Sequence, residues 1–326
     1  MAHHLRKRFD RIGLFALSVT VAAIATAGCD SLKPPHERFA TLVEARRGFK
    51  TSLRPQAGDR QPVDNPPPSV FRLVQYPAQP GSLQAYLTPD PRDGRRHPAI
   101  VWITGGDCNS IGEMWNPRPR SNDQTAAQYR EAGIVLMVAS LRGGNDNPGK
   151  KEGFLGEVDD VLAARDFLAQ QPYVDPDRIY LGGHSTGGTL AMLVAECSDK
   201  FRAVFAFGPV YDVAGYGDNS PFTPFDTHDA REDELRSPGY WLKCIKSPTW
   251  AIEGAAGDSN IHDLRKMNDV TTNANVHFLE VRDADHFADL APTNAYIAQA
   301  ILADTGPTCT IQLPQDRVND AFDRLR

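Results

Sequence analysis

Basic clusters are scarce in this 326-residue chain once its first residues are passed, and the formal net charge is −6. Nucleic-acid-binding proteins usually carry a basic face, so we set nucleic-acid binding aside. The chain also has no internal repeat and no low-complexity tract. Its content of 41% apolar and 23% charged residues is typical of a globular protein with a sizeable core.

Cysteine is also scarce, with five residues in all and no CxxC pair. A zinc site needs closely spaced ligands, and here the gaps are long, so we expect neither a metal nor a cofactor. In an oxidising compartment, four of the cysteines would allow three disulfide pairings or remain as buried thiols. The sequence does not choose between these; the four are Cys108, Cys197, Cys244 and Cys309.

The N-terminus has the pattern of a secretory signal peptide. Four basic residues at positions 6, 7, 8 and 11 precede an uncharged apolar run over 12–27. The run ends in Thr26-Ala27-Gly28-Cys29, which resembles the lipobox of bacterial lipoproteins, although Thr26 departs from the usual branched residue. We therefore predict a signal peptide over 1–28 and lipidation of Cys29. A plain signal peptide and an uncleaved anchor are the alternatives.

Lipidation of Cys29 would make the protein a periplasm-facing lipoprotein of the cell envelope, bound to the membrane through acyl chains. Asp30 follows that cysteine, and an aspartate in this place resembles the signal that retains lipoproteins at the inner membrane.

The remaining chain divides by composition. Residues 29–68 comprise a segment with helical character up to about 50 and a proline-rich linker over 54–68. From 69 to 305, apolar runs rich in β-branched residues alternate with amphipathic stretches, which predicts a mostly parallel sheet with helices on both faces. Residues 306–326 form a C-terminal tail. We expect strands at 71–76, 83–87, 99–103, 134–140, 178–181, 203–207, 249–252 and 276–281, and helices at 123–132, 157–169, 187–197 and 294–302.

The most informative segment is Gly183-His184-Ser185-Thr186-Gly187, which fits G-x-S-x-G between a predicted strand and a predicted helix. That context indicates a nucleophile elbow, in which a strained serine projects from a sharp turn and glycines two residues away avoid crowding. We predict Ser185 as the nucleophile of an α/β-hydrolase fold. The alternative is a glycine-rich turn with an incidental serine.

A serine hydroxyl needs a base, and in this fold the chain order is nucleophile, acid, histidine. His286 follows the last predicted strand in a short polar loop, which is where the base belongs. His262 and His277 compete with it. His184 adjoins the nucleophile, and we expect it to shape the pocket.

The carboxylate that orients the histidine should follow the strand at 249–252. Asp258 is the favoured candidate because it lies far enough along the loop to turn back toward the histidine. Glu253 at the strand end and Asp263 are the alternatives, and a surface aspartate without a role is another.

The oxyanion formed by serine attack needs backbone N–H donors. We expect one donor to be the amide of Thr186. The second should come from the glycine-rich turn Thr104-Gly105-Gly106-Asp107, from either Gly106 or Asp107, unless this is an ordinary strand-ending turn.

From about residue 85 to 290 the sequence resembles the catalytic domain of the prolyl oligopeptidase family. The matching pieces are Ile103-Thr-Gly-Gly-Asp, Ser140-Leu-Arg-Gly-Gly, Gly156-Glu-Val-Asp-Asp-Val, Val174-Asp-Pro-Asp-Arg-Ile, Gly183-His-Ser-Thr-Gly-Gly, Phe201-Arg-Ala-Val-Phe-Ala, Leu235-Arg-Ser-Pro and Asp285-His-Phe. The resemblance implies a triad of Ser185, Asp258 and His286 and a peptidase-like acyl-enzyme mechanism.

One departure limits what the resemblance implies. Peptidases of the family carry a β-propeller that often binds a peptide's free amine, and here only a short segment precedes the hydrolase domain. We therefore expect a serine hydrolase that cleaves short peptides or small esters. An acylhydrolase of unknown substrate is the alternative, as is a silent binding lipoprotein on the same fold. We interpret the aromatic-rich segment 211–242 as a small lid, and Arg142 as a structural arginine that binds local carbonyls.

Overall fold

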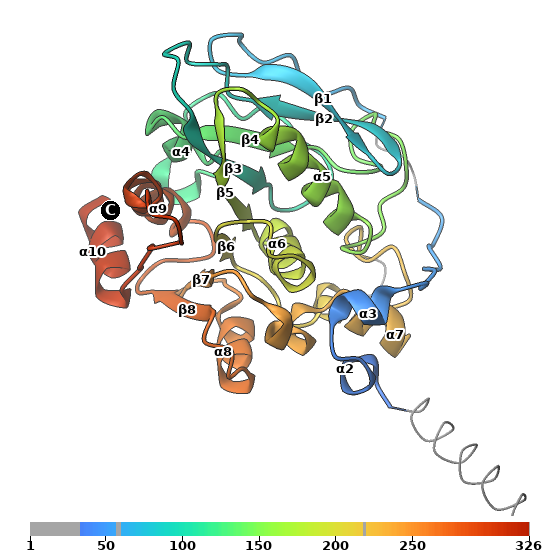
Figure 1. Ribbon diagram of the computed structural model, residues 1–326. Helices are drawn as coiled ribbons and strands as arrows, with labels where there is room; N and C mark the ends of the chain where they lie inside the picture. The colour runs from blue at the N-terminus through green and yellow to red at the C-terminus, as the bar shows by residue number, and fades with distance from the viewer. Residues whose placement is uncertain (1–32, 57–59, 218–219, 326) are drawn as a thin grey trace, which may run out of the picture.

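We describe residues 33–56, 60–217 and 220–325 of a computed structural model of the chain (Figure 1). The expected signal peptide over 1–28 and the lipidation site Cys29 lie outside these ranges. In the ranges that are described, no helix combines the length and the apolar run needed to cross a bilayer.

The described residues form an eight-stranded sheet with the order β1-β2-β4-β3-β5-β6-β7-β8. β1 pairs antiparallel with β2 and β2 with β4, whereas the pairs from β4 through β8 are parallel. The expected mixed, mostly parallel sheet is thus confirmed. The strands are β1 (Arg72–Ala78), β2 (Gly81–Leu87), β3 (His97–Ile103), β4 (Val135–Ala139), β5 (Val174–His184), β6 (Val204–Phe207), β7 (Thr249–Gly254) and β8 (Val276–Val281).

Helices cover both faces of the sheet, and Figure 1 shows α5 and α6 on one side and α9 and α10 on the other. The central strands are apolar on both faces because both are buried. In β3, for example, Val101 and Ile103 face the α5–α6 side, and Ile100 and Trp102 face the other. The larger helices are α5 (Glu157–Ala169), α6 (Thr186–Cys197), α8 (Ile261–Val270), α9 (Leu290–Ala303) and α10 (Gln315–Leu325).

Two terminal regions differ from the expectation. The predicted tail contains α10, which packs against α9 and β8 and buries Val318 and Phe322. The predicted N-terminal helical segment forms only two short helices, α2 (Pro35–Arg38) and α3 (Leu42–Arg46). The helix predicted at 123–132 is likewise reduced to α4 (Ala127–Glu131).

The segment expected as a lid connects β6 to β7 and is made of short pieces. They are Val213–Tyr216, α7 (Ala230–Glu234), Pro238–Tyr240 and Leu242–Cys244, and a further short turn, Arg120–Asn122, lies before α4. We call residues 211–242 the cap, of which 211–217 and 220–242 are described. Phe225, Leu235 and Trp241 of the cap are buried in the same core as α5 and α6.

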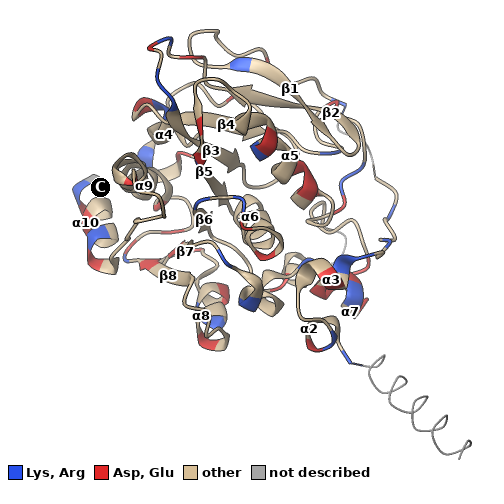
Figure 2. Cartoon of the chain, viewed as in Figure 1, with Lys and Arg blue, Asp and Glu red and all other residues tan. Residues whose placement is uncertain are grey.

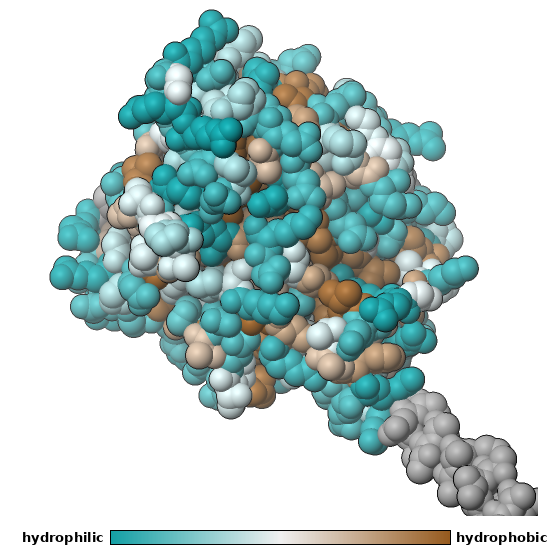
Figure 3. Space-filling model, in the orientation of Figure 1, coloured by the Kyte–Doolittle hydropathy of each residue, from teal (hydrophilic) through white to brown (hydrophobic). Residues whose placement is uncertain are grey.

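The segment before the sheet, residues 36–56, is fastened along the cap. Arg46 donates hydrogen bonds to the carbonyls of Leu235 and Phe154 at 2.7 and 3.0 Å, and Ser52 N donates to Glu232 at 2.8 Å. Leu42 and Ala45 of α3 are buried against the core. Figure 3 shows a mostly hydrophilic face with hydrophobic residues gathered between α6 and α3, where this segment packs.

Candidate active site

Ser185 lies at the junction between β5 and α6, with φ +57° and ψ −116°. Positive φ is unfavourable for a residue with a side chain, and such strain is concentrated at functional sites. The Ser185 amide donates to the carbonyl of Phe207 on β6 at 2.7 Å, which holds the turn against the neighbouring strand.

The glycines that flank this serine are required by close packing. A Cβ on Gly183 would collide with the Gly187 carbonyl, and a Cβ on Gly187 would collide with the carbonyls of Ile103 and Thr104. The sharp turn is therefore possible only because the two positions lack side chains, as the motif predicts.

His286 follows β8 in the loop that leads to α9, and its ring lies beside the nucleophile turn. Its Nδ1 is 3.0 Å from Oε2 of Glu253, whose side chain is completely buried at the end of β7. Glu253 also accepts from the amides of Gly254 at 2.8 Å and Asn260 at 3.2 Å. Three donors thus fix a buried carboxylate against the imidazole.

Gly208 makes room for this pair. It has φ +57°, and a Cβ at this position would overlap the His286 ring and lie against Glu253 Oε2. Its carbonyl accepts from the Asn260 side chain at 2.8 Å. Neither Gly208 nor Asn260 was singled out from the sequence, because neither belongs to a recognisable motif.

Asp258, the favoured orienting carboxylate in the sequence, is not the one that the structure brings to His286. Its side chain is exposed, and it is its backbone carbonyl that accepts from the His286 amide, at 3.2 Å. Glutamate is one methylene longer than aspartate, so Glu253 reaches the imidazole directly from the strand end. Asp263, the third candidate, accepts from the Tyr211 amide at 2.9 Å.

The competing histidines lie elsewhere. His262 is exposed on α8, and His277 is exposed on β8, where its ring stacks on Trp250 at a centroid distance of 5.0 Å. The His286 ring is hydrogen-bonded to Glu253, and among the described residues no hydrogen bond joins it to Ser185 Oγ. Such bonds commonly tighten only when a substrate is bound.

His184 is buried and packs against the imidazole of His286, with ring centroids 4.6 Å apart. Its Nε2 lies 3.0 Å from the His286 carbonyl oxygen, so Nε2 carries the proton and donates. Burial and the neighbouring His286 lower the pKa of His184 to about 3, which keeps the ring neutral at ordinary pH. His184 therefore positions the His286 loop, a more definite role than the pocket-shaping one expected.

The loop after β3 passes directly beside the nucleophile. A Cβ on Gly105 would lie 3.3 Å from Cβ of Ser185 and 2.8 Å from Nδ1 of His184. Thr186 Oγ1 donates to the Gly106 carbonyl at 2.8 Å. The two predicted sources of oxyanion donors, Thr186 and the turn containing Gly106 and Asp107, are thus adjacent.

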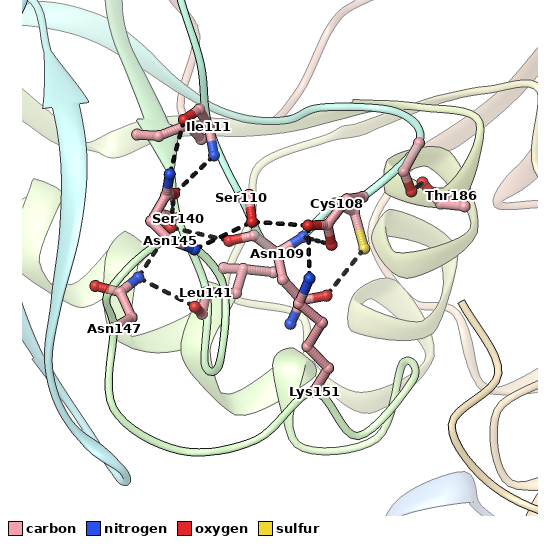
Figure 4. Close-up of polar contacts among 12 residues, drawn as sticks. Cys108, Asn109, Ser110, Ile111, Ser140, Leu141, Asn145, Asn147, Lys151 and Thr186 are labelled. Carbon is pink, nitrogen blue, oxygen red and sulfur yellow. Dashed lines mark hydrogen bonds and ion pairs between the residues drawn. The ribbon is translucent and has the colours of Figure 1, made fainter. Parts of the chain in front are cut away.

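A second layer of polar contacts fixes this loop (Figure 4). Ser140 Oγ donates to Asn145 Oδ1 at 2.7 Å, and that same amide oxygen accepts from the Ile111 amide at 2.9 Å. Lys151 pairs with Asp107 at 2.6 Å, on the side of the loop away from Asn145. A Cβ on Gly144 would overlap the carbonyl of Asn109, so the two loops touch backbone to backbone.

Arg142, in the same motif as Gly144, is structural as expected, but its partners are carboxylates rather than carbonyls. It forms two 2.8 Å bonds to Asp160, which is fully buried on α5, and one to Glu152. The pair ties the loop after β4 to the start of α5.

A buried carboxylic acid lies behind the His286–Glu253 pair. Asp289, at the start of α9, is 1% exposed, and neither of its carboxyl oxygens has a hydrogen-bond partner within the described residues. Burial, together with the charges of Glu253 and Asp285, raises the pKa of Asp289 well above its usual value. This favours the neutral acid.

The four described cysteines are free thiols. In the part of the chain that is described, no group of three histidine, cysteine, aspartate or glutamate side chains is arranged to hold a metal ion.

Tyr216 of the cap lies 3.0 Å from Thr189 Oγ1, one turn along α6 from Ser185, and stacks on Phe154. The cap therefore contacts the first turn of α6, which begins directly after Ser185.

Comparisons with known proteins find similar peptidases and esterases. The model of the prolyl oligopeptidase family, Peptidase_S9, matches residues 120–247. Dipeptidyl-peptidase 5 of Porphyromonas gingivalis is 27% identical over 188 residues, which are 52% of this chain and 27% of that protein. A putative esterase, NocK, of Nocardia uniformis is 26% identical over 241 residues, which are 66% of this chain and 65% of that protein.

A solved acylaminoacyl peptidase superposes with a TM-score of 0.55 at 16% identity, over 76% of this chain and 43% of that one. A solved 2,6-dihydroxy-pseudo-oxynicotine hydrolase gives a TM-score of 0.54 at 14% identity, over 72% and 68% of the two chains. These likenesses show the α/β-hydrolase fold. The chain spans only about a quarter of the dipeptidyl peptidase it matches. Residues 120–247, which contain the nucleophile elbow, thus match the prolyl oligopeptidase family of serine hydrolases, and they lie within an α/β-hydrolase fold.

Proposed function

We propose that the protein hydrolyses small esters and short peptides through an acyl-enzyme formed on Ser185. His286 takes the proton from Ser185 Oγ as the oxygen attacks the carbonyl carbon, and then gives it to the leaving group. Water, deprotonated by the same imidazole, releases the acyl group. Glu253 replaces Asp258 as the orienting carboxylate in this proposal.

The observation that carries the proposal is the 3.0 Å contact between His286 Nδ1 and the buried Glu253, beside a serine in a strained backbone conformation. A buried carboxylate on Nδ1 holds the imidazole in the tautomer whose Nε2 can accept a proton, and it stabilises the imidazolium that forms. A silent binding protein has no physical need for this combination.

The developing oxyanion would be stabilised by the Thr186 amide and by the amide of Gly106 or Asp107. The hydrogen bond from Thr186 Oγ1 to the Gly106 carbonyl supports this arrangement, because it couples the two donor segments. Preorganised donors need not move during the reaction, which is the source of their catalytic effect.

A fluorophosphonate probe tests the nucleophile. We expect the full chain to gain one probe mass and the Ser185→Ala variant to gain none, with both folded by circular dichroism. Equal labelling of the two proteins would reject Ser185.

The bond type is tested by comparing 4-nitrophenyl acetate and butyrate with alanyl and prolyl 4-nitroanilides. An amide nitrogen must be protonated as it leaves, whereas nitrophenolate leaves unaided. Turnover of both classes with a common dependence on His286 supports the proposal. Turnover of neither, by protein that the probe labels, would contradict it.

We further propose that Cys29 is lipidated and tethers the enzyme to the periplasmic side of a membrane. The sequence pattern before Cys29 supports this, and several acyl chains on one cysteine would hold the protein stably. The protein expressed in a didermic bacterium should partition into detergent, and Cys29→Ala should remain aqueous or uncleaved. Equal partition of the two would refute lipidation.

A further inference from the structure

A groove beside the oxyanion loop has the chemistry of an anion site. It encloses about 380 Å³ between the N-terminal segment, the loop before α5 and the cap, and prolines from the first and last of these form part of its wall. A narrow cavity, lined in part by Asp107, Cys108 and Phe154, shares three lining residues with this groove. The groove and the narrow cavity are therefore neighbours, and the cavity adjoins the loop that carries Asp107. The shared residues are Lys151, Pro221 and Pro224.

Arg54 brings the first cation. Its amide donates to the Pro224 carbonyl at 2.7 Å, which fixes the arginine backbone on the cap. Its Nη1 is buried and has no hydrogen-bond partner among the described residues. The nearby Asp226 is 3.8 Å from Nη2 and 63% exposed, so it forms only a weak pair. The Arg54 side chain is 34% exposed, so its guanidinium has donors left for an acceptor that enters the groove.

Lys151 brings the second cation. Its Nζ contacts Asp107 at 2.6 Å, and its carbonyl accepts from the Gln56 side chain at 2.7 Å. An ammonium group has three donors, and the single contact with Asp107 leaves two of them for another acceptor. The N-terminal segment thus supplies Arg54 and, through Gln56, fixes the backbone of Lys151.

The described residues that line the groove include Arg54 and Lys151 and no carboxylate. Figure 2 shows acidic and basic residues interspersed along the rest of the chain, so the two cations are not part of an extended basic segment. Two cations on apolar walls, with one unmet guanidinium donor, suit a planar anion that can accept from both.

We propose that this groove binds a carboxylate of the substrate, located a few bonds from the carbonyl that Ser185 attacks. The inference rests on the proposed function and adds a substrate class to it, namely acids such as a dicarboxylic half-ester or a peptide with a free carboxyl end. The guanidinium of Arg54 donates two hydrogen bonds to the carboxylate. Lys151 contacts the same carboxylate and, through its ion pair with Asp107, connects it to the oxyanion loop.

Matched esters test the proposal. On the acyl side, mono-4-nitrophenyl glutarate is compared with 4-nitrophenyl valerate, which has the same chain length without the charge. On the leaving side, the valerate ester of 4-hydroxybenzoate is compared with that of phenol. The measured quantity is the ratio of kcat/KM between the charged and neutral members of each pair. The proteins are wild type, Arg54→Gln, Arg54→Lys, and Lys246→Gln as an exposed control that does not line the groove.

We expect wild type to favour the charged member of one pair, and Arg54→Gln to reduce that ratio about 10- to 100-fold, mainly through KM. Arg54→Lys should give an intermediate ratio, and Lys246→Gln should match wild type. Because the ratio cancels any general loss of activity, a partly unfolded variant does not mimic the effect.

A ratio that is the same in wild type and Arg54→Gln in both pairs would overturn the carboxylate site while leaving the hydrolase intact. Failure of the proposed function looks different, since no ester would then be turned over and no probe would attach at Ser185. Raising the salt concentration should lower the wild-type ratio, because screening weakens a partly exposed ion pair.

Discussion

Replacing Glu253 by glutamine should remove most of the catalytic rate. The amide keeps the size of the side chain but loses the charge that stabilises a protonated His286. It also presents an NH2 group to a site where every neighbour is a donor, namely His286 Nδ1 and the amides of Gly254 and Asn260. The imidazole would then favour the wrong tautomer.

The comparable change in other serine hydrolases lowers kcat about 10⁴-fold, and here we expect a loss of about 10³- to 10⁴-fold, or roughly 4–5.5 kcal/mol of transition-state stabilisation. Asp258→Asn is the matched control. Its exposed side chain is not in contact with His286, so its kcat should stay within about threefold of wild type, as for other surface changes.

The assay is 4-nitrophenyl butyrate hydrolysis at pH 8, with urea unfolding to show that each variant is folded. The reasoning is refuted if Asp258→Asn loses activity and Glu253→Gln keeps it, because the carboxylate on the loop would then be the one that acts on the imidazole.

Three other predictions follow from the site and its support. His184→Phe keeps a ring beside His286 but removes the bond to its carbonyl, so kcat should fall about tenfold; an unchanged kcat would show that His184 only fills space. Because burial lowers the pKa of His184 to about 3, the unfolded state binds the extra proton first, and stability is lost as pH falls from about 6.5 toward 3. Wild type should lose about 2 kcal/mol more than His184→Phe between pH 8 and pH 5, measured by urea unfolding, and equal losses would contradict this sign. Arg142→Met leaves buried Asp160 unpaired and should cost about 3–5 kcal/mol in the free energy of unfolding, whereas a cost below 1 kcal/mol would show that the pair is dispensable. Gly144→Ala should disturb the oxyanion loop and lower kcat at least about tenfold with KM less affected, and wild-type kinetics would disprove that coupling.

The sequence predicted what short-range signals determine. The elbow is a local motif in which each residue type answers a local steric demand, so Ser185 and its glycines could be read directly. The alternation of apolar runs likewise predicted the strands of the sheet. His286 was predicted from its place after the last strand, which depends only on chain order, and the structure places it against a buried carboxylate.

The orienting carboxylate was harder, because the choice depends on reach in three dimensions. Asp258 has the better position along the loop, but the extra methylene of Glu253 and the space left by Gly208 decide the contact. Helix α10 was missed for a related reason. Its apolar residues are few, and Val318 and Phe322 become core only because α9 and β8 lie beside them.

The fastening of residues 36–56 along the cap has a consequence for access to Ser185. Residues 36–56 are hydrogen-bonded to the cap at Leu235, Glu232 and Pro224. The cap cannot move away from the core unless these hydrogen bonds break at the same time. The cap is therefore a fixed cover rather than a mobile lid. The cap is then ordered when the chain folds, so little conformational entropy is left to be lost when a ligand binds.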